Sequence, residues 1–114
     1  MSDLEFKKQI REHCVSFLTR REHSQLELLN KVASKGFERY LIQEVINGLA
    51  EEGWQSDLRF AENYARYRIK KGFGPIKIAH ELWQRGVVEF DLEPVVWDLA
   101  DDWLDLLQQL YQKK

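Results

Sequence analysis

The chain nearly repeats its own pattern of residue types at a spacing of fifty residues. Segment 24–37 reads SQLELLNKVASKGF, and segment 74–87 reads GPIKIAHELWQRGV. With this offset Gly36 matches Gly86, and the apolar positions before and after them coincide. A fixed period of this size is typical of helical arrays, in which each unit buries part of its apolar face against a neighbour. Such arrays present a binding surface more often than they build a catalytic pocket.

Apolar residues recur every three or four positions along most of the chain, which predicts amphipathic helices. Ser24 and Glu27 form an S-x-x-E capping box that begins one of them, and glycines such as Gly36 end them. The apolar pattern continues from Trp103 to Tyr111. The expected helices cover about 3–21, 24–36, 38–52, 56–72 and 74–86, with a sixth starting between 91 and 94.

These helices predict an all-α fold of tandem three-helix repeats. We expect a first repeat over 1–53, a second over 54–102, and the start of a third repeat or a C-terminal capping helix over 103–114. The matched apolar positions predict one continuous seam through both repeats, with Trp54 filling the seam between them. Gly48 lies inside an expected helix, where glycine costs about 1 kcal/mol relative to alanine, and this predicts a close helix–helix approach at that position.

Composition limits the class of protein. The 114 residues are 44% apolar and 32% charged, with a formal net charge of −2. No stretch approaches the roughly 18 apolar residues of a membrane span, and the polar N-terminus does not resemble a signal peptide. The single cysteine, Cys14, lies on an apolar stripe and is expected in the core. One cysteine cannot form an internal disulfide framework, which fits a cytoplasmic protein.

The small net charge hides a gradient along the chain. Residues 1–85 carry 15 Lys/Arg against 12 Asp/Glu, whereas residues 86–114 carry 2 against 7. Stretch 66–77 holds five basic residues and no acid, so it could face phosphate or an acidic protein surface. The alternative for each residue is a solvated helix end, where cations complement the helix dipole. The candidate binding residues are Arg20, Arg21, Lys31, Lys35, Arg66, Arg68, Lys70, Lys71, Lys77 and Arg85.

Two runs of residues resemble the signatures of the RecX family. The first is LTRREHS at 18–24, followed by Glu27-Leu28, Lys31 and Lys35-Gly36. The second is GWQSD at 53–57, followed by RFAE at 59–62 and, further on, by glycine, proline and basic positions up to Gly86-Val87. The second run is the more specific, because its glycines, proline, aromatics and charges follow in one uninterrupted order. The resemblance covers roughly residues 10–100 and departs after that, since most of a third repeat is lacking.

The resemblance implies a function and a set of partners. RecX-like proteins are bacterial regulators that bind the RecA nucleoprotein filament and inhibit its recombinase and ATPase activities, and so act in DNA recombination, repair and the SOS response. They also bind single- and double-stranded DNA more weakly. The family is not enzymatic, and the resemblance implies no catalytic residue, cofactor or metal.

Two other function classes remain open from the residues alone. A general nucleic-acid-binding helical module would need no RecA. An enzyme acting on DNA would need a metal at the acidic run Asp98, Asp101, Asp102 and Asp105, but these residues share one helix without a converging partner, and a solvated face is the favoured interpretation. His23 is expected to pack or cap locally. An exposed apolar strip from Trp103 to Tyr111 would favour self-association through the C-terminal helix.

Overall fold

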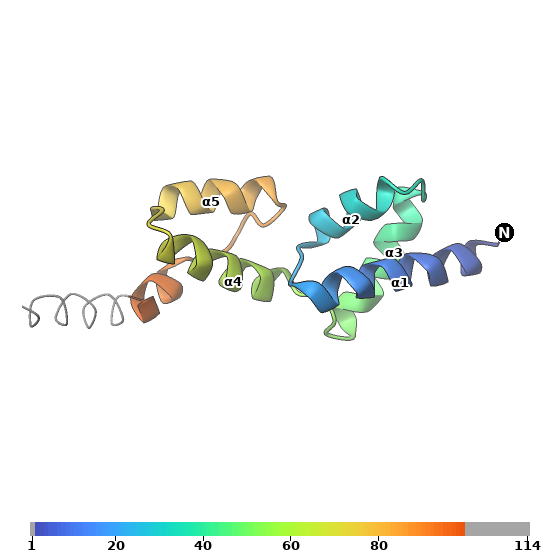
Figure 1. The fold of residues 1–114 in the computed structure, drawn as a ribbon, viewed down its shortest axis with the longest axis horizontal. Coiled ribbons are helices and arrows are strands. Elements are labelled where there is room, and N and C mark those ends of the chain that lie inside the picture. The colour runs from blue at the N-terminus through green and yellow to red at the C-terminus, as the bar shows by residue number, and fades with distance from the viewer. Residues whose placement is uncertain (1, 100–114) are drawn as a thin grey trace, which may run out of the picture.

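The computed structural model describes residues 2–99, and every regular element within that range is a helix (Figure 1). The all-α prediction is therefore confirmed for this part of the chain. The molecule is elongated, with extents of 68 × 23 × 23 Å, and α4 follows α1 along the long axis. The elements are α1 (Asp3–Arg20), α2 (Gln25–Ala33), α3 (Arg39–Glu51), α4 (Asp57–Lys70), α5 (Pro75–Gln84) and a helical segment at 93–99.

Local sequence signals set the helix ends. The Ser24 hydroxyl accepts a hydrogen bond from the Glu27 N–H, and the Glu27 carboxylate accepts one from the Ser24 N–H, so the predicted capping box begins α2. The Ser56 hydroxyl caps α4 in the same way, accepting from the Arg59 N–H. Gly36, after α2, has a φ of +97°, a left-handed conformation that favours glycine.

The first bundle consists of α1, α2 and α3, which enclose a core of their own. Its buried residues lie at the three- and four-residue spacing seen in the sequence, so each helix turns one apolar stripe inward. Cys14 is part of this core, as expected. The buried set is Ile10, Cys14, Leu28, Val32, Leu41, Ile42, Ile46 and Leu49.

The second bundle consists of α4, α5 and segment 93–99. The three- and four-residue apolar spacing of the sequence predicts that Tyr67 and Ala79 face inward from α4 and α5, but both are exposed. Tyr67 is 56% exposed and Ala79 is also exposed, because the buried stripes of α4 and α5 are narrower than the apolar pattern of the sequence. The buried set is Phe60, Ala61, Ala65, Ile78, Leu82, Val95 and Leu99.

The expected continuous apolar seam is wrong, because the two bundles have separate buried clusters. Trp54 does not fill the space between them and is 46% exposed. Its neighbour Gln55 is buried there instead, at 2% exposure. The Gln55 amide donates to the Asp57 carboxylate and to the backbone carbonyl of His23, at 2.9 and 3.3 Å. The hydrogen bonds of Gln55 make this junction polar, and Leu26 also lies close to Gly86 there, since a Cβ atom added to Gly86 would be 2.9 Å from Leu26 Cβ.

Several expectations fall on residues that the structure does not describe. These are the third repeat or capping helix over 103–114, self-association through it, and the acidic residues Asp101, Asp102 and Asp105. The repeat boundaries near residues 53 and 102 also stay a prediction. The close approach expected at Gly48 is wrong within residues 2–99, since a Cβ atom added there would meet no heavy atom within 4 Å.

Candidate functional site

Three predicted binding residues, Lys70, Lys71 and Lys77, lie exposed around the turn between α4 and α5. Lys70 lies in the last turn of α4, where a cation complements the helix dipole. Two of the ammonium groups lie over aromatic rings. Lys71 Nζ is 4.8 Å from the centre of the Tyr67 ring, and Lys77 Nζ is 4.5 Å from that of Phe73. The rings hold these cations by cation–π attraction and leave them accessible to an anion.

Arg66, Arg68 and Arg85 belong to the same bundle but are engaged in internal contacts. Arg66 pairs with Asp98 at 3.0 Å on the surface. Arg68 donates two hydrogen bonds to Glu81, and both side chains are more than four-fifths buried. Arg85 donates to the backbone carbonyl of Glu81 at 2.9 Å, and its guanidinium lies 4.7 Å from the Tyr64 ring centre. The contacts of these arginines therefore stabilise the packing of α4 against α5 and segment 93–99.

The predicted residues of the first bundle are divided in the same way. Arg20 and Lys35 are exposed near the ends of α1 and α2. Arg21 instead makes a two-point ion pair with Glu27, at 3.2 Å for each contact. Lys31 donates to His23 Nε2 at 2.8 Å and lies 5.0 Å from the Phe17 ring centre. The structure therefore does not bring all ten predicted residues into one continuous patch of free cations.

His23 is buried, at 1% exposure, and has the packing role expected from the sequence. Its Nδ1–H donates to the backbone carbonyl of Arg21 at 3.0 Å, which leaves Nε2 to accept from Lys31. This pair of contacts requires the neutral imidazole. Burial lowers the pKa of His23 below 6.5, and the charges of Arg21 and Lys31 add to that effect, opposed by the backbone hydrogen bond.

A small cleft lies where the end of α1 meets one edge of α4. Its volume is about 280 Å³. Phe60 and Tyr64 form part of the wall, with ring centres 5.7 Å apart, and Tyr67 stands exposed at the rim. Sequence reasoning missed this site because it assigned Tyr67 to the apolar core stripe of α4. The lining residues are Arg21, Glu22, Phe60, Asn63, Tyr64 and Tyr67.

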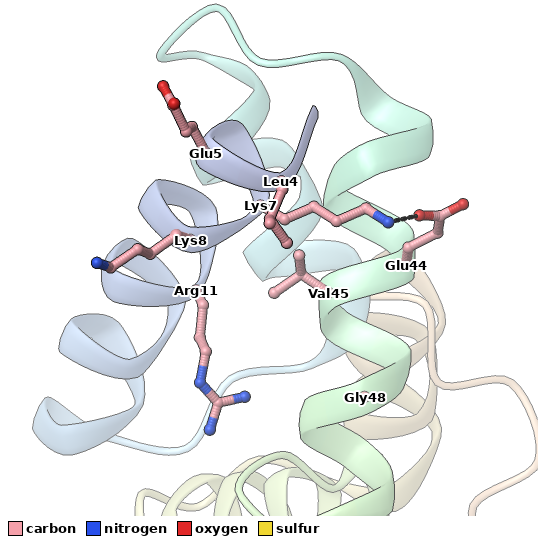
Figure 2. A pocket seen from close by; sticks show the side chains of 8 residues that line it. All are labelled: Leu4, Glu5, Lys7, Lys8, Arg11, Glu44, Val45 and Gly48. Atoms are coloured by element: carbon pink, nitrogen blue, oxygen red, sulfur yellow. Dashed lines mark ion pairs between the residues drawn. The ribbon is translucent and has the colours of Figure 1, made fainter. Parts of the chain in front are cut away.

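A larger, open groove of about 550 Å³ lies between α1 and α3 (Figure 2). Leu4 and Val45 point toward each other across the groove. Gly48 lines the groove on the α3 side and has no side chain that could fill it. Lys7 and Glu44 form an ion pair of 2.6 Å along the rim, and Arg11 pairs with Glu52 at 2.8 Å. Two cations of this groove are thus paired with acids, whereas Lys70, Lys71 and Lys77 have no ion pair in the described part of the chain.

The described residues offer little for catalysis. Within 2–99 no group of three or more His, Cys, Asp or Glu side chains could hold a metal ion. Burial raises the pKa of the Cys14 thiol to about 11, so it is not a thiolate nucleophile near neutral pH. No helix in the described range has the length and apolar character needed to span a membrane.

Comparison with known proteins identifies the family of this chain. Residues 56–93 match the family model described as RecX, second three-helix domain. A protein of Pseudomonas putida named regulatory protein RecX is 37% identical over 105 residues, which cover 92% of this chain and 74% of the relative. A protein of the same name from Legionella pneumophila is 37% identical over 103 residues, covering 90% of this chain and 69% of the relative. The helices that carry the exposed lysines are the matched domain, and the chain belongs to the RecX family.

Proposed function

We propose that this protein is a regulator that binds the RecA nucleoprotein filament and inhibits its recombinase and ATPase activities. Membership of the RecX family supports RecA as the partner. The observation that supports the position of the contact surface is the group of exposed lysines at the turn between α4 and α5, Lys70, Lys71 and Lys77, none of which has an ion pair within residues 2–99. RecA acts in the cytoplasm, which is therefore the proposed compartment of this protein.

The elongated shape suits a polymeric partner. A chain with a long dimension of 68 Å can contact more than one subunit of a helical filament. Exposed lysines at the turn between α4 and α5 can meet filament phosphates or carboxylates, releasing counterions as they do so. Binding along the filament would hinder strand exchange by occupying its groove, without any chemistry by this chain.

Co-sedimentation with RecA filaments, with and without an ATP analogue, tests the proposal. We expect the protein to pellet with the filament and to lower its ATPase rate. The variant Lys70→Glu, Lys71→Glu, Lys77→Glu should bind more weakly, and wild-type binding should fall steeply with added salt. Lys71→Glu should weaken binding on its own, whereas Lys8→Glu, an equal charge reversal at an exposed position on α1, should leave binding unchanged. A wild-type protein that remains in the supernatant at low salt would refute RecA binding.

A general nucleic-acid-binding module is the second candidate. The aromatic cleft beside α4 favours it, because aromatic side chains near cations are typical of single-strand binding sites. This function predicts an affinity for naked DNA at least as high as that for RecA-coated DNA. Preference for the coated form supports the filament regulator.

A further inference from the structure

We propose that the cleft between the end of α1 and α4 binds one unpaired nucleobase of a single DNA strand. The cleft is the one defined above by Arg21, Glu22, Phe60, Asn63, Tyr64 and Tyr67. The inference deepens the proposed function, on which it rests for the class of ligand. It adds a second kind of contact, because the lysines at the turn reach phosphate whereas this cleft reaches a base.

The size of the cleft favours a single ring system. Its volume of about 280 Å³ lies just below the range of about 300–1,000 Å³ that is usual for pockets of drug-sized ligands. Within a duplex each base is covered by its neighbours and paired along its edge, so it cannot enter a side cleft. An unpaired base can be splayed out of the strand and inserted.

The exposed ring of Tyr67 is the stacking surface. Tyr67 is 56% exposed although its neighbours Phe60 and Tyr64 on the same helix are more buried. Asn63 lies one helical turn before Tyr67, so both side chains lie on the same side of α4. Its amide offers hydrogen-bond donors and an acceptor to the edge of a stacked base. Together these residues supply a ring face and a polar edge within one small concavity.

The charges near the cleft leave one cation available to the backbone of the strand. Lys71 lies over Tyr67 at 4.8 Å, on the side of the turn between α4 and α5. Arg21 is one of the lining residues, and its side chain is 48% exposed. Arg21 is already paired with Glu27. Glu22 pairs with Arg59 through Oε1 at 3.1 Å, and its Oε2 is buried without a hydrogen-bond partner within residues 2–99. A strand can therefore place a phosphate near Lys71, which has no ion pair within residues 2–99, and stack the adjoining base on Tyr67.

The test compares two fluorescent oligonucleotides with equal numbers of phosphates, a thymidine 12-mer and the same strand built from abasic residues. Fluorescence anisotropy with the full chain measures both affinities. Stacking of one base predicts that the wild-type protein binds the thymidine strand about 5- to 150-fold more tightly than the abasic strand. Tyr67→Ala should abolish this preference and Tyr67→Phe should keep it. Tyr40→Ala, which removes an equally exposed tyrosine from α3, is the control and should keep it as well.

Equal wild-type affinity for the two strands would overturn the inference, as would no binding to either strand or a preference that survives Tyr67→Ala. Circular dichroism of each variant checks that the helices are intact. RecA co-sedimentation distinguishes this failure from failure of the proposed function. If the wild-type protein pellets with RecA filaments but shows no base preference, only the proposal of a base-binding cleft is refuted. If it prefers the thymidine strand but does not pellet with RecA filaments, only the proposal of filament binding is refuted.

Discussion

Arg68 donates two hydrogen bonds to the carboxylate of Glu81, through Nε at 3.0 Å and Nη2 at 2.8 Å. The guanidinium carbon also lies 3.6 Å from the centre of the Phe73 ring. The two charged side chains are 19% and 16% exposed, so this pair is far more protected from solvent than a surface ion pair. It joins α4 to α5 and uses a cation that the sequence suggested for partner binding.

We expect Arg68→Ala to lower the free energy of unfolding by about 1–3 kcal/mol, because it leaves the Glu81 carboxylate without its main partner in a partly buried site. Urea denaturation followed by circular dichroism measures this change. The matched control is Lys70→Ala, an exposed change two residues away, which should stay within about 0.5 kcal/mol of wild type. A stable Arg68→Ala protein that has lost DNA or filament binding would show that Arg68 contacts the partner directly.

The helices and their ends could be predicted from the sequence because their causes are local. Apolar spacing, the Ser24 capping box and the helix-ending glycines each act within a few residues. The roles of individual polar side chains could not, because they depend on contacts between segments far apart in the chain. Arg68 and Lys70 look alike in the sequence, and only the position of Glu81 on α5 separates a structural cation from a free one. Likewise, the turn at Gly53 exposes Trp54 and buries Gln55, which reverses the expectation from their hydrophobicity.

The buried His23 predicts a loss of stability on acidification. Its folded-state pKa is lowered from 6.5, so the unfolded chain takes up a proton at a higher pH than the folded chain does. Stability from this group is therefore complete above pH 6.5 and declines as the pH falls below that value. Protonation would place a positive charge against Lys31 and Arg21. Urea midpoints measured between pH 7.5 and 5.5 should fall in the wild-type protein.

His23→Gln should flatten this pH dependence, whereas His80→Gln, an exposed change on α5, should retain it. Glu27 also faces His23. Burial pushes the pKa of Glu27 up, but its hydrogen bonds from Arg21 and Ser24 outweigh this, and the net shift is downward from 4.5. Its contribution is therefore lost only below pH 4.5, outside the window of the test. An unchanged slope in His23→Gln would assign the pH dependence to another group.

Gly48 and Gly86 should respond in opposite ways to alanine. Gly48 lies inside α3, and a Cβ atom there would meet nothing within 4 Å. Gly48→Ala should therefore stabilise the protein by up to about 1 kcal/mol. Gly86 has a φ of +85°, and its added Cβ would lie 2.9 Å from Leu26 Cβ, so Gly86→Ala should destabilise it. Thermal unfolding of both variants gives the comparison, and a destabilising Gly48→Ala would reveal a close neighbour of α3 outside residues 2–99.

Gln55 links the two bundles, and its removal should weaken their coupling. The buried amide donates to the His23 carbonyl and to Asp57, and its oxygen accepts from the Gln25 side chain at 3.3 Å. Gln55→Ala leaves these buried or partly buried groups with fewer partners, which should cost about 1–3 kcal/mol. The two bundles have separate apolar cores. The lost free energy should therefore weaken the coupling between the bundles more than the stability of either core.

Native-state hydrogen exchange measures that coupling. In the wild-type protein we expect the amides of Leu28 in the first bundle and Ile78 in the second to exchange with similar free energies, as one cooperative unit. In Gln55→Ala the two values should separate, because a bundle that has lost the junction can open by itself. Asn30→Ala is the control, since Asn30 lies on α2 and its side chain accepts a hydrogen bond from Arg39, at 3.4 Å, within the first bundle. Equal protection of both amides in Gln55→Ala would show that the contact of Leu26 with Gly86 is enough to couple the bundles.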